Sequence, residues 1–527
     1  MGDTEPPVDE EVLVSLDEHK ASAGPDPVSD DEKRLHELGY AQELSRSMSG
    51  FSNFAVSFTI ISVLSGCLTS YTIGLKGGGP VVISWGWLGV GAMTLLVALA
   101  MAEVCSSYPT AGGLYYWSAK LAKRNGPAWS WFTGWFNFIG QVAVTAAIVY
   151  GSAAFLNPLL DLQFGYDVSL GHTFTLFAIL LVTHALLNQF GVRLVSLLSS
   201  VSVWWHVLGV AIVVGVLAFK PSHHQSVGFV FTEFVNETGW QYGAYAALIG
   251  LLLSQYTLTG YDASAHMTEE THDAARSGPR GIVNSVLISV VAGWILLLGV
   301  TFAIQDYAAA VEGGPAAIFI AATGETTGKL LILVSFGAQF FCGMSSVTAN
   351  SRMIYAFSRD GALPLSSFWH RINKRSRTPT NAIWLAAGGA FVLALPAIWN
   401  LTAYLAVTSV AVIGLYIAYV IPTFLRLRQG ADFKAGPWNL GRWSKPVGTL
   451  AVAWVLFISV VFMLPPANPI NRDSFNYAPV AILVVLGGAG LWWVLSARKW
   501  FKGPKVQGTA EELAAIEKEL QSLGKES

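Results

Sequence analysis

The stretch 251–270, which reads LLLSQYTLTGYDASAHMTEE, holds the features on which the prediction of the fold depends. It begins as an apolar helix and then reaches Thr259 and Gly260, followed by an aromatic residue, Tyr261, and an acid, Asp262. A carboxylate near the middle of a membrane is costly, so it normally faces a cavity or a polar partner. Unwound backbone at that depth persists only beside protein or water. We therefore predict a discontinuous transmembrane helix with a binding site at its break. The alternative is an intact helix whose Asp262 bonds a neighbouring helix.

The composition indicates that most of the remaining chain also lies in a membrane. Of the 527 residues, 53% are hydrophobic and 12% are charged, whereas a soluble domain carries about 25% charged residues. Apolar runs long enough to span a bilayer recur along the chain, which predicts an all-α polytopic membrane protein with about twelve transmembrane helices. The predicted spans are residues 51–75, 81–104, 128–156, 174–190, 194–219, 242–267, 282–304, 329–355, 382–398, 401–425, 448–464 and 478–495.

The distribution of basic residues predicts the orientation of these spans. With the N-terminus inside, the outer loops contain only four of the 31 Lys and Arg residues, namely Lys76, Lys220, Lys329 and Arg472. Basic residues collect on the cytoplasmic side of membrane proteins. We therefore expect both termini in the cytoplasm, which requires an even number of spans. The membrane would be the plasma membrane, or the inner membrane if the source is bacterial.

The two ends of the chain differ from the apolar region at 47–500. Residues 1–46 are polar and acidic and contain no apolar h-region, which predicts a disordered cytoplasmic arm rather than a signal peptide. Residues 501–527 form a predicted cytoplasmic tail. Its apolar residues have the spacing of a short amphipathic helix, and they are Leu513, Ile516, Leu520 and Leu523.

Two further features concern the loops and the cysteines. The outer loop at 305–328 contains an apolar segment that could form a short helix across the external entrance. The three cysteines, Cys67, Cys105 and Cys342, are scattered along the chain, which indicates neither a disulfide framework nor a metal site. The sequence gives no sign of a cofactor or of nucleic-acid binding.

Span one carries a second interruption, VLSGCLTSY at 63–71, in which Ser65, Gly66 and Cys67 place a small residue between polar side chains. A pair of interrupted segments in corresponding positions of two halves marks the binding site of many secondary transporters. The free N–H groups of a half-helix suit a carboxylate, and free carbonyl groups suit an ammonium group. A zwitterion such as an amino acid would satisfy both. The alternative for Gly66 is close helix packing.

Three motifs carry a resemblance to a known superfamily. They are EVCSSYPTAGGLYYW at 103–117, SQYTLTGYDASAHMTEET at 254–271 and SRDGALP at 358–364. They resemble the signatures of the amino acid–polyamine–organocation superfamily after spans two and eight, and the sixth span of its amino acid/choline transporter branch. That branch includes fungal permeases for γ-aminobutyrate (GABA) and choline and plant bidirectional amino-acid transporters. The resemblance covers roughly residues 35–500.

The resemblance implies a fold and a mechanism. The fold would be a 5+5 inverted repeat with broken helices 1 and 6, with repeat one at about 51–219 and repeat two at about 242–425. Two extra helices would follow at about 448–495. The mechanism would be alternating access around a central site.

The resemblance also implies roles for individual residues. The backbone at Ser65, Gly66 and Cys67 would hold the substrate carboxylate, although this copy lacks the first glycine of the commoner pattern. Thr259 and Gly260 would form the unwound turn of span six. Tyr261 would be the aromatic residue that gates the site. The substrate amine would point at free carbonyl groups, with Asp262 as a further partner.

His206 lies halfway along span five, where some proton-coupled relatives carry a lysine next to the broken first helix. Histidine titrates near neutral pH, so His206 is our candidate for proton coupling. The alternative is a neutral histidine that is hydrogen-bonded between helices. Because other members of the superfamily are exchangers, coupling to a proton does not follow from the resemblance alone.

Other polar residues in the spans have two interpretations each. Asn137 and Gln141 share one face of span three and could line the cavity or could bond neighbouring helices. The hydroxyl groups of span eight could form a sodium site beside span one, but we favour contacts between helices and a proton as the coupling ion. These hydroxyl groups belong to Ser345, Ser346 and Thr348.

The sequence therefore predicts a permease that moves amino acids or GABA by secondary active transport, with the proton as coupling ion. Choline is the alternative substrate, because a quaternary ammonium group prefers an aromatic cage and aromatic residues are available near the expected site. These are Trp135, Trp204, Trp205 and Tyr261. A nutrient sensor that binds without transport is a second alternative. A membrane-bound enzyme is not indicated, because the loops contain neither an H-E-x-x-H nor a G-x-S-x-G motif.

Overall fold

The computed structural model describes residues 29–190, 192–373, 376–400, 402–472 and 474–525. Within these ranges the regular elements are all helical, and eleven helices are long and apolar enough to cross a membrane. The predicted sixth span is divided into short helices and therefore falls outside that set of eleven. The eleven helices and this divided span confirm the prediction of an all-α polytopic membrane protein.

The first half of the chain supplies five spans and the helices between them. These elements are α2 (Asp30–Leu38), α3 (Gly50–Ile61), α4 (Val63–Thr69), α5 (Tyr71–Lys76), α6 (Gly79–Val81), η1 (Val82–Gly86), α7 (Trp87–Ser107), α8 (Gly113–Leu121), α9 (Gly126–Phe164), α10 (Leu170–Gln189) and α11 (Val192–Phe219).

The sixth to tenth spans follow. Their elements are α12 (Val227–Thr232), α13 (Gly243–Gly250), α14 (Leu252–Thr257), α15 (Ala263–His266), η2 (Thr268–Glu270), α16 (Ala274–Phe302), α17 (Tyr307–Thr323), α18 (Glu325–Arg359), α19 (Ser366–Trp369), α20 (Thr380–Ala394), η3 (Leu395–Ile398) and α21 (Thr402–Gln429). The last elements are η4 (Gly430–Asp432), η5 (Gly441–Trp443), α22 (Ser444–Met463), α23 (Ala478–Trp492), η6 (Trp493–Ala497), α24 (Arg498–Trp500) and α25 (Ala510–Lys525).

Helix α9 forms the centre of the bundle and packs against α8, α10, α18, α20 and α21. In its most apolar stretch 89% of the residues are buried, whereas the corresponding value for the last span is 11%. The backbones of α9 and α21 approach closely at Gly140 and Gly414, because a Cβ atom on Gly140 would lie 2.7 Å from the Leu415 nitrogen. Small residues at such crossings let helices in a membrane gain packing contacts. The last two spans are peripheral, which agrees with their prediction as extra helices.

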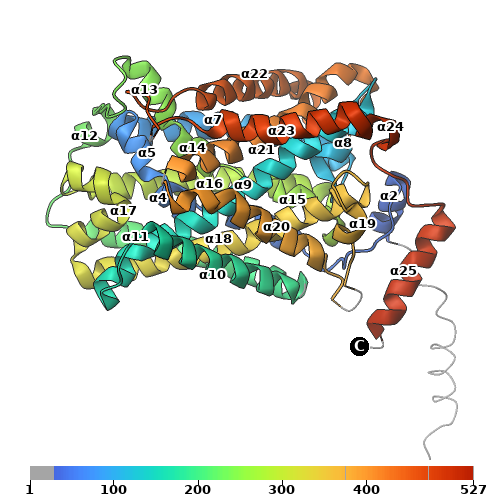
Figure 1. The fold of residues 1–527 in the computed structure, drawn as a ribbon, viewed down its shortest axis with the longest axis horizontal. Helices are drawn as coiled ribbons and strands as arrows, with labels where there is room; N and C mark the ends of the chain where they lie inside the picture. Colours follow the sequence, from blue (N-terminus) through green and yellow to red (C-terminus); the bar gives the residue numbers. More distant parts are fainter. Residues whose placement is uncertain (1–28, 191, 374–375, 401, 473, 526–527) are drawn as a thin grey trace, which may run out of the picture.

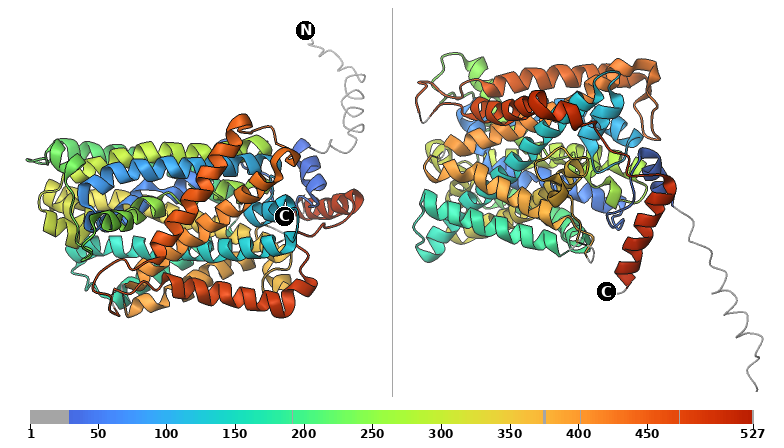
Figure 2. Two further views of the ribbon diagram at one scale, coloured as in Figure 1. Left: turned by 90° about the horizontal axis from the view of Figure 1, so that it is seen from above. Right: turned by 45° about the vertical axis from the view of Figure 1, so that its right-hand side comes forward.

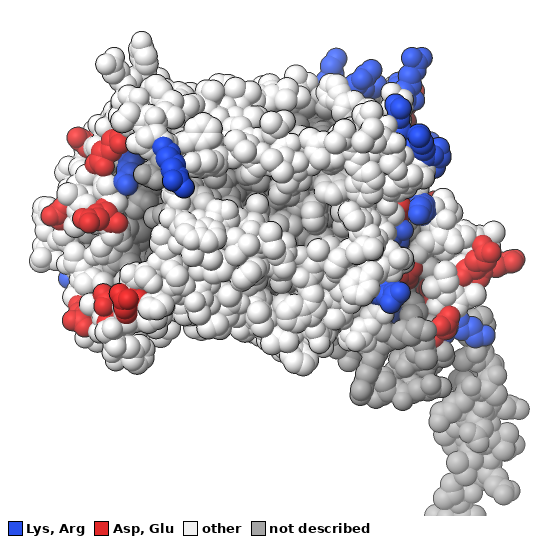
Figure 3. Space-filling model, viewed as in Figure 1, with Lys and Arg blue, Asp and Glu red and all other residues white. Residues whose placement is uncertain are grey.

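The long helices run side by side between two ends of the molecule (Figure 1). Helices α2 and α25 lie together at one of these ends, which we call the terminal end, and the turned views of Figure 2 agree. On the face shown in Figure 3 the charged side chains gather at the two ends, and a broad band between them is free of charge. Such a band suits the hydrocarbon core of a bilayer, where an unpaired charge is costly.

The tails differ in part from the prediction. Residues 1–28 of the predicted disordered arm lie outside the described residues, but α2 and the segment after it are ordered. Ser29 caps α2 by accepting a hydrogen bond from the Glu32 N–H, and Arg34 donates to the Ser107 carbonyl over 2.8 Å. The cap and the contact with the bundle stabilise this part of the arm, which its polar composition did not predict.

The two short helices expected outside the spans are present. Helix α17 lies in the loop at 305–328, and its Tyr307 hydroxyl donates to the Leu75 carbonyl over 2.8 Å. Helix α25 lies in the C-terminal tail, where Leu513 is buried and Glu517 accepts a hydrogen bond from the Gln42 N–H over 2.6 Å. The two tails are therefore joined to each other at the terminal end.

Candidate functional site

The first span breaks at Ser62, three residues before the predicted position. Helix α3 ends at Ile61 and α4 starts at Val63, and Ser62 has φ 35° and ψ 84°, in the left-handed region. The Ser62 carbonyl accepts hydrogen bonds from the N–H groups of Ser65 and Gly66 at 2.8 and 2.9 Å. Ser65, Gly66 and Cys67 therefore lie inside α4, and their placement at the break was wrong. Their N–H groups take part in a helical turn because Ser62 supplies the turn instead.

The sixth span breaks where the sequence predicted. Helix α14 ends at Thr257 and α15 starts at Ala263, and Gly260 between them has φ 89°. Glycine adopts this conformation at little cost because it has no Cβ atom. A Cβ atom there would also lie 2.2 Å from Cγ2 of Ile60 in α3. The Thr259 hydroxyl donates to the Tyr256 carbonyl over 2.7 Å and so satisfies one carbonyl group at the end of α14.

The two breaks lie against each other and enclose a small cavity. Its volume is about 10 Å³, which is close to the least that admits one water molecule. Spans one, three, six and eight form its walls, with Ser65, Gly66, Val144, Thr257, Thr259 and Cys342 among the lining residues. Of the predicted binding residues, Ser65, Gly66 and Thr259 line this cavity, whereas Cys67, Gly260, Tyr261 and Asp262 do not.

Gly66 allows the two broken helices to touch. A Cβ atom on Gly66 would lie 2.6 Å from Cγ2, 2.7 Å from Oγ1 and 2.8 Å from Cα of Thr257. The third of these atoms belongs to the backbone, so a larger residue could be accommodated only if α4 and α14 moved apart. Gly66 therefore allows the two helices to pack closely, and it also lies in the cavity wall.

Asp262 is buried and bonded to neighbouring helices. Its Oδ1 atom accepts a hydrogen bond from the Tyr419 hydroxyl over 2.7 Å, and its Oδ2 atom accepts one from Gln141 Nε2 over 2.7 Å. His266 Nε2 lies 3.3 Å from the same Oδ2 atom. This arrangement matches the alternative interpretation of Asp262, because both carboxylate oxygens are engaged by the protein.

Asn137 and Gln141 contact span six instead of the cavity. Gln141 binds Asp262, and Asn137 Nδ2 lies 3.2 Å from His266 Nε2, one helical turn further along each helix. Both side chains are buried. Of the two interpretations drawn from the sequence, the structure therefore agrees with the one in which Asn137 and Gln141 bond a neighbouring helix.

Two tyrosines of α21 support the unwound backbone of span six, and the sequence analysis missed both. The Tyr416 hydroxyl donates to the Leu258 carbonyl over 2.6 Å, and the Tyr419 hydroxyl accepts from the Gly260 N–H over 3.2 Å. The ring of Tyr261 lies 4.9 Å from that of Tyr419. The available signal was the presence of two buried hydroxyl groups in one apolar span, since each needs a partner in the membrane.

His206 lies beside the break in span one, at the place that the resemblance implied. Its Nε2 atom is 2.6 Å from the Ser62 hydroxyl, and its Nδ1 atom is 2.7 Å from the Ser202 carbonyl. Because a carbonyl can only accept, Nδ1 carries a proton. In the neutral ring Nε2 then accepts from Ser62, and in the charged ring it donates to the same oxygen.

Several of the aromatic and hydroxyl side chains considered above lie away from the cavity. Trp204 and Trp205 are 62% and 40% exposed on the outer surface of α11, so they cannot form a cage at the breaks. Trp135 packs against Phe357 and Trp492. Two of the three hydroxyl groups of span eight bond other helices, with Ser346 2.8 Å from Thr145 and Thr348 2.6 Å from Asn188. The third, Ser345 Oγ, is buried and has no hydrogen-bond partner among the described residues.

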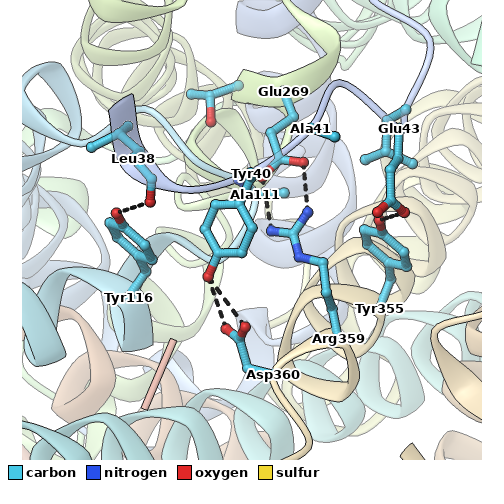
Figure 4. A network of polar contacts seen from close by, with 12 residues as sticks. Leu38, Tyr40, Ala41, Glu43, Ala111, Tyr116, Glu269, Tyr355, Arg359 and Asp360 are labelled. Atoms are coloured by element: carbon cyan, nitrogen blue, oxygen red, sulfur yellow. Dashed lines mark hydrogen bonds and ion pairs between the residues drawn. The ribbon is translucent and has the colours of Figure 1, made fainter. Parts of the chain in front are cut away.

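The three sequence motifs meet at the terminal end. Glu269, which ends span six, accepts a hydrogen bond from the Ala111 N–H over 2.9 Å and pairs with Arg359 over 3.0 Å. Its neighbour Glu270 pairs with Arg352 over 2.8 Å, and all four charged side chains are buried. Figure 4 shows Glu269 and Arg359 facing each other beside Ala111. This paired network seals the terminal end, because a buried charge deprived of its partner would be costly.

The N- and C-terminal tails complete the seal through Asp360. Its carboxylate accepts hydrogen bonds from Tyr40 over 3.1 Å, from Tyr115 over 2.7 Å and from the Lys505 N–H over 3.0 Å (Figure 4 shows the contact with Tyr40). Burial raises the pKa of Asp360, and the nearby Arg359 guanidinium and these hydrogen bonds oppose the rise. The guanidinium of Arg359 also lies 3.8 Å from the centre of the Tyr40 ring.

The opposite end is hollowed. A cavity of about 340 Å³ lies beside α5, α13 and the start of α21, and its lining includes Thr72, Lys76, Glu237, Ile249 and Ser409. Figure 1 places α5 and α13 at the end remote from α2 and α25. The structure therefore has a hollow at one end and buried ion pairs at the other, and the hollow shares no lining residue with the small cavity between the breaks. Among the described residues no group of three or more His, Cys, Asp or Glu side chains could hold a metal ion.

Comparison with known proteins agrees with this geometry. A profile described as "Amino acid permease" matches residues 48–486. The chain is 46% identical to the amino-acid permease BAT1 of Arabidopsis thaliana, over 91% of this chain and 97% of that protein. It is 46% identical to the BAT1 homologue of Oryza sativa subsp. japonica, over 89% and 95%, and 30% identical to amino-acid permease 2 of Neurospora crassa, over 90% and 89%. The chain belongs to the amino acid permease family of the amino acid–polyamine–organocation superfamily.

Proposed function

We propose that the protein is a secondary active transporter that moves amino acids or GABA across the plasma membrane by alternating access, with a proton as the coupling ion. The observation that carries this proposal is the small cavity between two broken helices. The buried ion pairs at one end of the bundle and the separate hollow at the other end support two ends that open in turn. The relatives named amino-acid permeases support the substrate class. The terminal end, with most of the basic residues on its side, would face the cytoplasm.

The substrate would bind at the breaks. Its carboxylate would meet Ser65, Gly66 and Thr259, which line the cavity. Because their N–H and hydroxyl groups now bond the Ser62 and Tyr256 carbonyls, the two breaks would rearrange to offer these donors to the substrate. Its amine would face the carbonyl groups that the breaks free. Because the cavity is too small for an amino acid, α4 and α14 would separate to admit one, and Gly260 and Tyr261 would move with the unwound turn. Cys67 and Asp262 would act from behind the cavity wall, Asp262 by holding the turn in place.

Alternating access would require the two ends to exchange roles. In the present conformation Glu269–Arg359 and Glu270–Arg352 close the cytoplasmic side. Opening that side would break these pairs in the presence of water, which stabilises the separated charges. The outer cavity beside Lys76 and Glu237 would close at the same time.

Proton coupling at His206 rests on its contact with the broken helix. A proton that arrives on Nε2 would reverse the direction of the hydrogen bond to Ser62, which is the residue at the turn. Sodium is the less favoured ion, because Ser346 and Thr348 already bond other helices.

Uptake into proteoliposomes tests the function. With an inward proton gradient, a panel of radiolabelled amino acids, GABA and choline should show saturable uptake of amino acids or GABA. Collapse of the gradient should remove accumulation but should leave counterflow of labelled against unlabelled substrate. Binding without counterflow would indicate a sensor. Uptake of choline alone would overturn the substrate class, and accumulation that ignores the gradient would overturn the coupling ion.

A further inference from the structure

A second buried histidine, His266, forms a pair with Asp262 on the far side of the span-six break from the cavity. Both side chains are fully buried, and His266 Nε2 lies 3.3 Å from Asp262 Oδ2. The pair lies between α9, which supplies Asn137 and Gln141, and α21, which supplies Tyr419. An ionisable pair buried within the spans of a membrane protein is a candidate for function.

The hydrogen bonds fix where the protons of His266 are. Its Nδ1 atom lies 2.9 Å from the Ala111 carbonyl, which can only accept, so Nδ1 carries a proton. Without a proton, Nε2 can accept from Asn137 Nδ2 at 3.2 Å, but its lone pair also faces Asp262 Oδ2 at 3.3 Å, which is repulsive. A further proton, on Nε2 or on Oδ2, would turn the second contact into a hydrogen bond. The Nε2–Oδ2 contact is therefore the place in this network where an added proton would form a new hydrogen bond.

Asn137 can bond the His266 ring in either protonation state. In the present orientation of its amide, Nδ2 can donate to an unprotonated Nε2 over 3.2 Å, and the buried Oδ1 has no hydrogen-bond partner among the described residues. Rotation of the amide by half a turn brings Oδ1 to His266, where it can accept from Nε2–H. The amide of Asn137 therefore accommodates the arrival and the loss of a proton on Nε2.

The other groups around the pair are neutral or already paired. Gln141 and Tyr419 donate to Asp262, and Tyr261 and Tyr416 lie beside Tyr419. The nearest acid along the chain is Glu269, whose charge is balanced by Arg359. No lysine or arginine is paired with Asp262 in the described part of the chain. Among the side chains that contact Asp262, His266 is therefore the one that can carry a positive charge.

The pair is also connected to the seal at the terminal end. Ala111 accepts from His266 through its carbonyl and donates to Glu269 through its N–H over 2.9 Å. One residue of the loop after span two thus joins the proton-binding contact to the ion pair Glu269–Arg359. A Cβ atom on Gly113, two residues further, would lie 3.3 Å from the His266 ring, so the loop fits closely around the imidazole.

We propose that the Asp262–His266 pair is the site that binds the coupling proton and relays its presence to the cytoplasmic seal. This inference rests on the proposed proton-coupled transport and replaces His206 as the carrier of the proton. The step is one of proton binding and release only: Nε2–H···Oδ2 forms when the proton arrives and is lost when it leaves.

The test uses the full-length protein in proteoliposomes with a pH-sensitive dye inside. The wild type should acidify the interior when substrate enters. In His266→Gln the proton flux per substrate should fall roughly tenfold or more, while counterflow at equal pH stays within about threefold of the wild type, since only the imidazole is removed. Asp262→Asn should lose the proton flux as well, and its counterflow should also fall, because Asp262 holds the unwound turn in place. For His266→Gln, a purely structural role would lower both activities together.

Two further variants complete the design. His184→Gln is the matched control, because His184 is a buried histidine on α10 that packs against Phe340 away from both breaks, and it should keep the proton flux. His206→Gln should also keep it. Loss of the flux in His206→Gln alone, or its retention in both pair variants, would overturn the inference. A wild type that exchanges amino acids without moving protons would instead refute the proposed coupling itself.

Discussion

In span one the chain turns at a serine, whereas in span six it turns at a glycine. Ser62 alone forms the first break, with a left-handed φ of 35° that is strained for a residue with a Cβ atom. The second break takes five residues, 258–262, around Gly260 at φ 89°. Both occur at the first helix of a predicted repeat, yet the residues responsible are of different kinds.

The support for the two breaks also differs. The first turn is held by the bond from Ser62 to His206 on α11 and by two bonds from α18, from Cys342 to the Ile60 carbonyl and from Gln339 to the Leu64 carbonyl. The second is held by Tyr416 and Tyr419 of α21, which bond the Leu258 carbonyl and the Gly260 N–H. The unwound stretch of span six is therefore fixed by neighbouring helices as well as by its own glycine. The comparison teaches that a break can be produced by local sequence or by its surroundings.

The largest effect is expected at the glycine of the second break. Gly260→Val places a β-branched residue at φ 89° and a Cβ atom 2.2 Å from Ile60. Strain and overpacking together should cost on the order of 4 kcal/mol. We expect little folded protein, measured as the monodisperse peak in fluorescence-detected size exclusion. A yield equal to that of the wild type would show that the turn does not need the glycine.

Gly66→Val should affect transport more than folding. The added side chain pushes α4 away from α14 at the cavity wall, because it meets the Thr257 backbone at 2.8 Å. Overpacking costs about 1–3 kcal/mol, so the protein should still insert. Displacement at the site should lower uptake by roughly 100-fold. Gly389→Val on α20 is the control, since a Cβ atom there meets only Val142 at ordinary contact distance. Full activity of Gly66→Val would remove Gly66 from the binding site.

The same comparison shows how much the sequence could predict. Span six was predicted correctly, because Gly260 in an apolar run next to Asp262 is a local signal. Span one was predicted three residues too late, because Gly66 resembles a breaker although the turn is at Ser62. Nothing in the residue type serine marks that turn, which depends on contacts with α11. The twelve spans were predictable from hydropathy, whereas the partners of Asp262 depend on how α9 and α21 pack.

The tyrosines of α21 should differ in importance. Tyr416→Phe leaves the Leu258 carbonyl without its partner and removes the 3.3 Å contact with Thr94, at a cost of about 1–3 kcal/mol. Tyr419→Phe removes the bonds to Gly260 and to Asp262, and it should cost about 1 kcal/mol more because a buried carboxylate loses a donor. Thermal unfolding in detergent measures both, with Tyr404→Phe on the same helix as the reference. Losses no larger than that of Tyr404→Phe would mean that the bonds to the unwound turn are not what stabilises it.

The smallest effect is expected at the first break. Two substitutions of Ser62 separate the cost of its strained backbone from the gain of its hydrogen bond to His206. Ser62→Ala removes the bond to His206 but keeps the strained φ, so it should destabilise the protein by about 1 kcal/mol. Ser62→Gly removes the same bond but relieves the strain, which is worth about 1 kcal/mol or slightly more. The two effects should nearly cancel, and the melting temperature of Ser62→Gly should equal that of the wild type and exceed that of Ser62→Ala. The reverse order would show that the turn at Ser62 is unstrained and that the contact with His206 alone holds it.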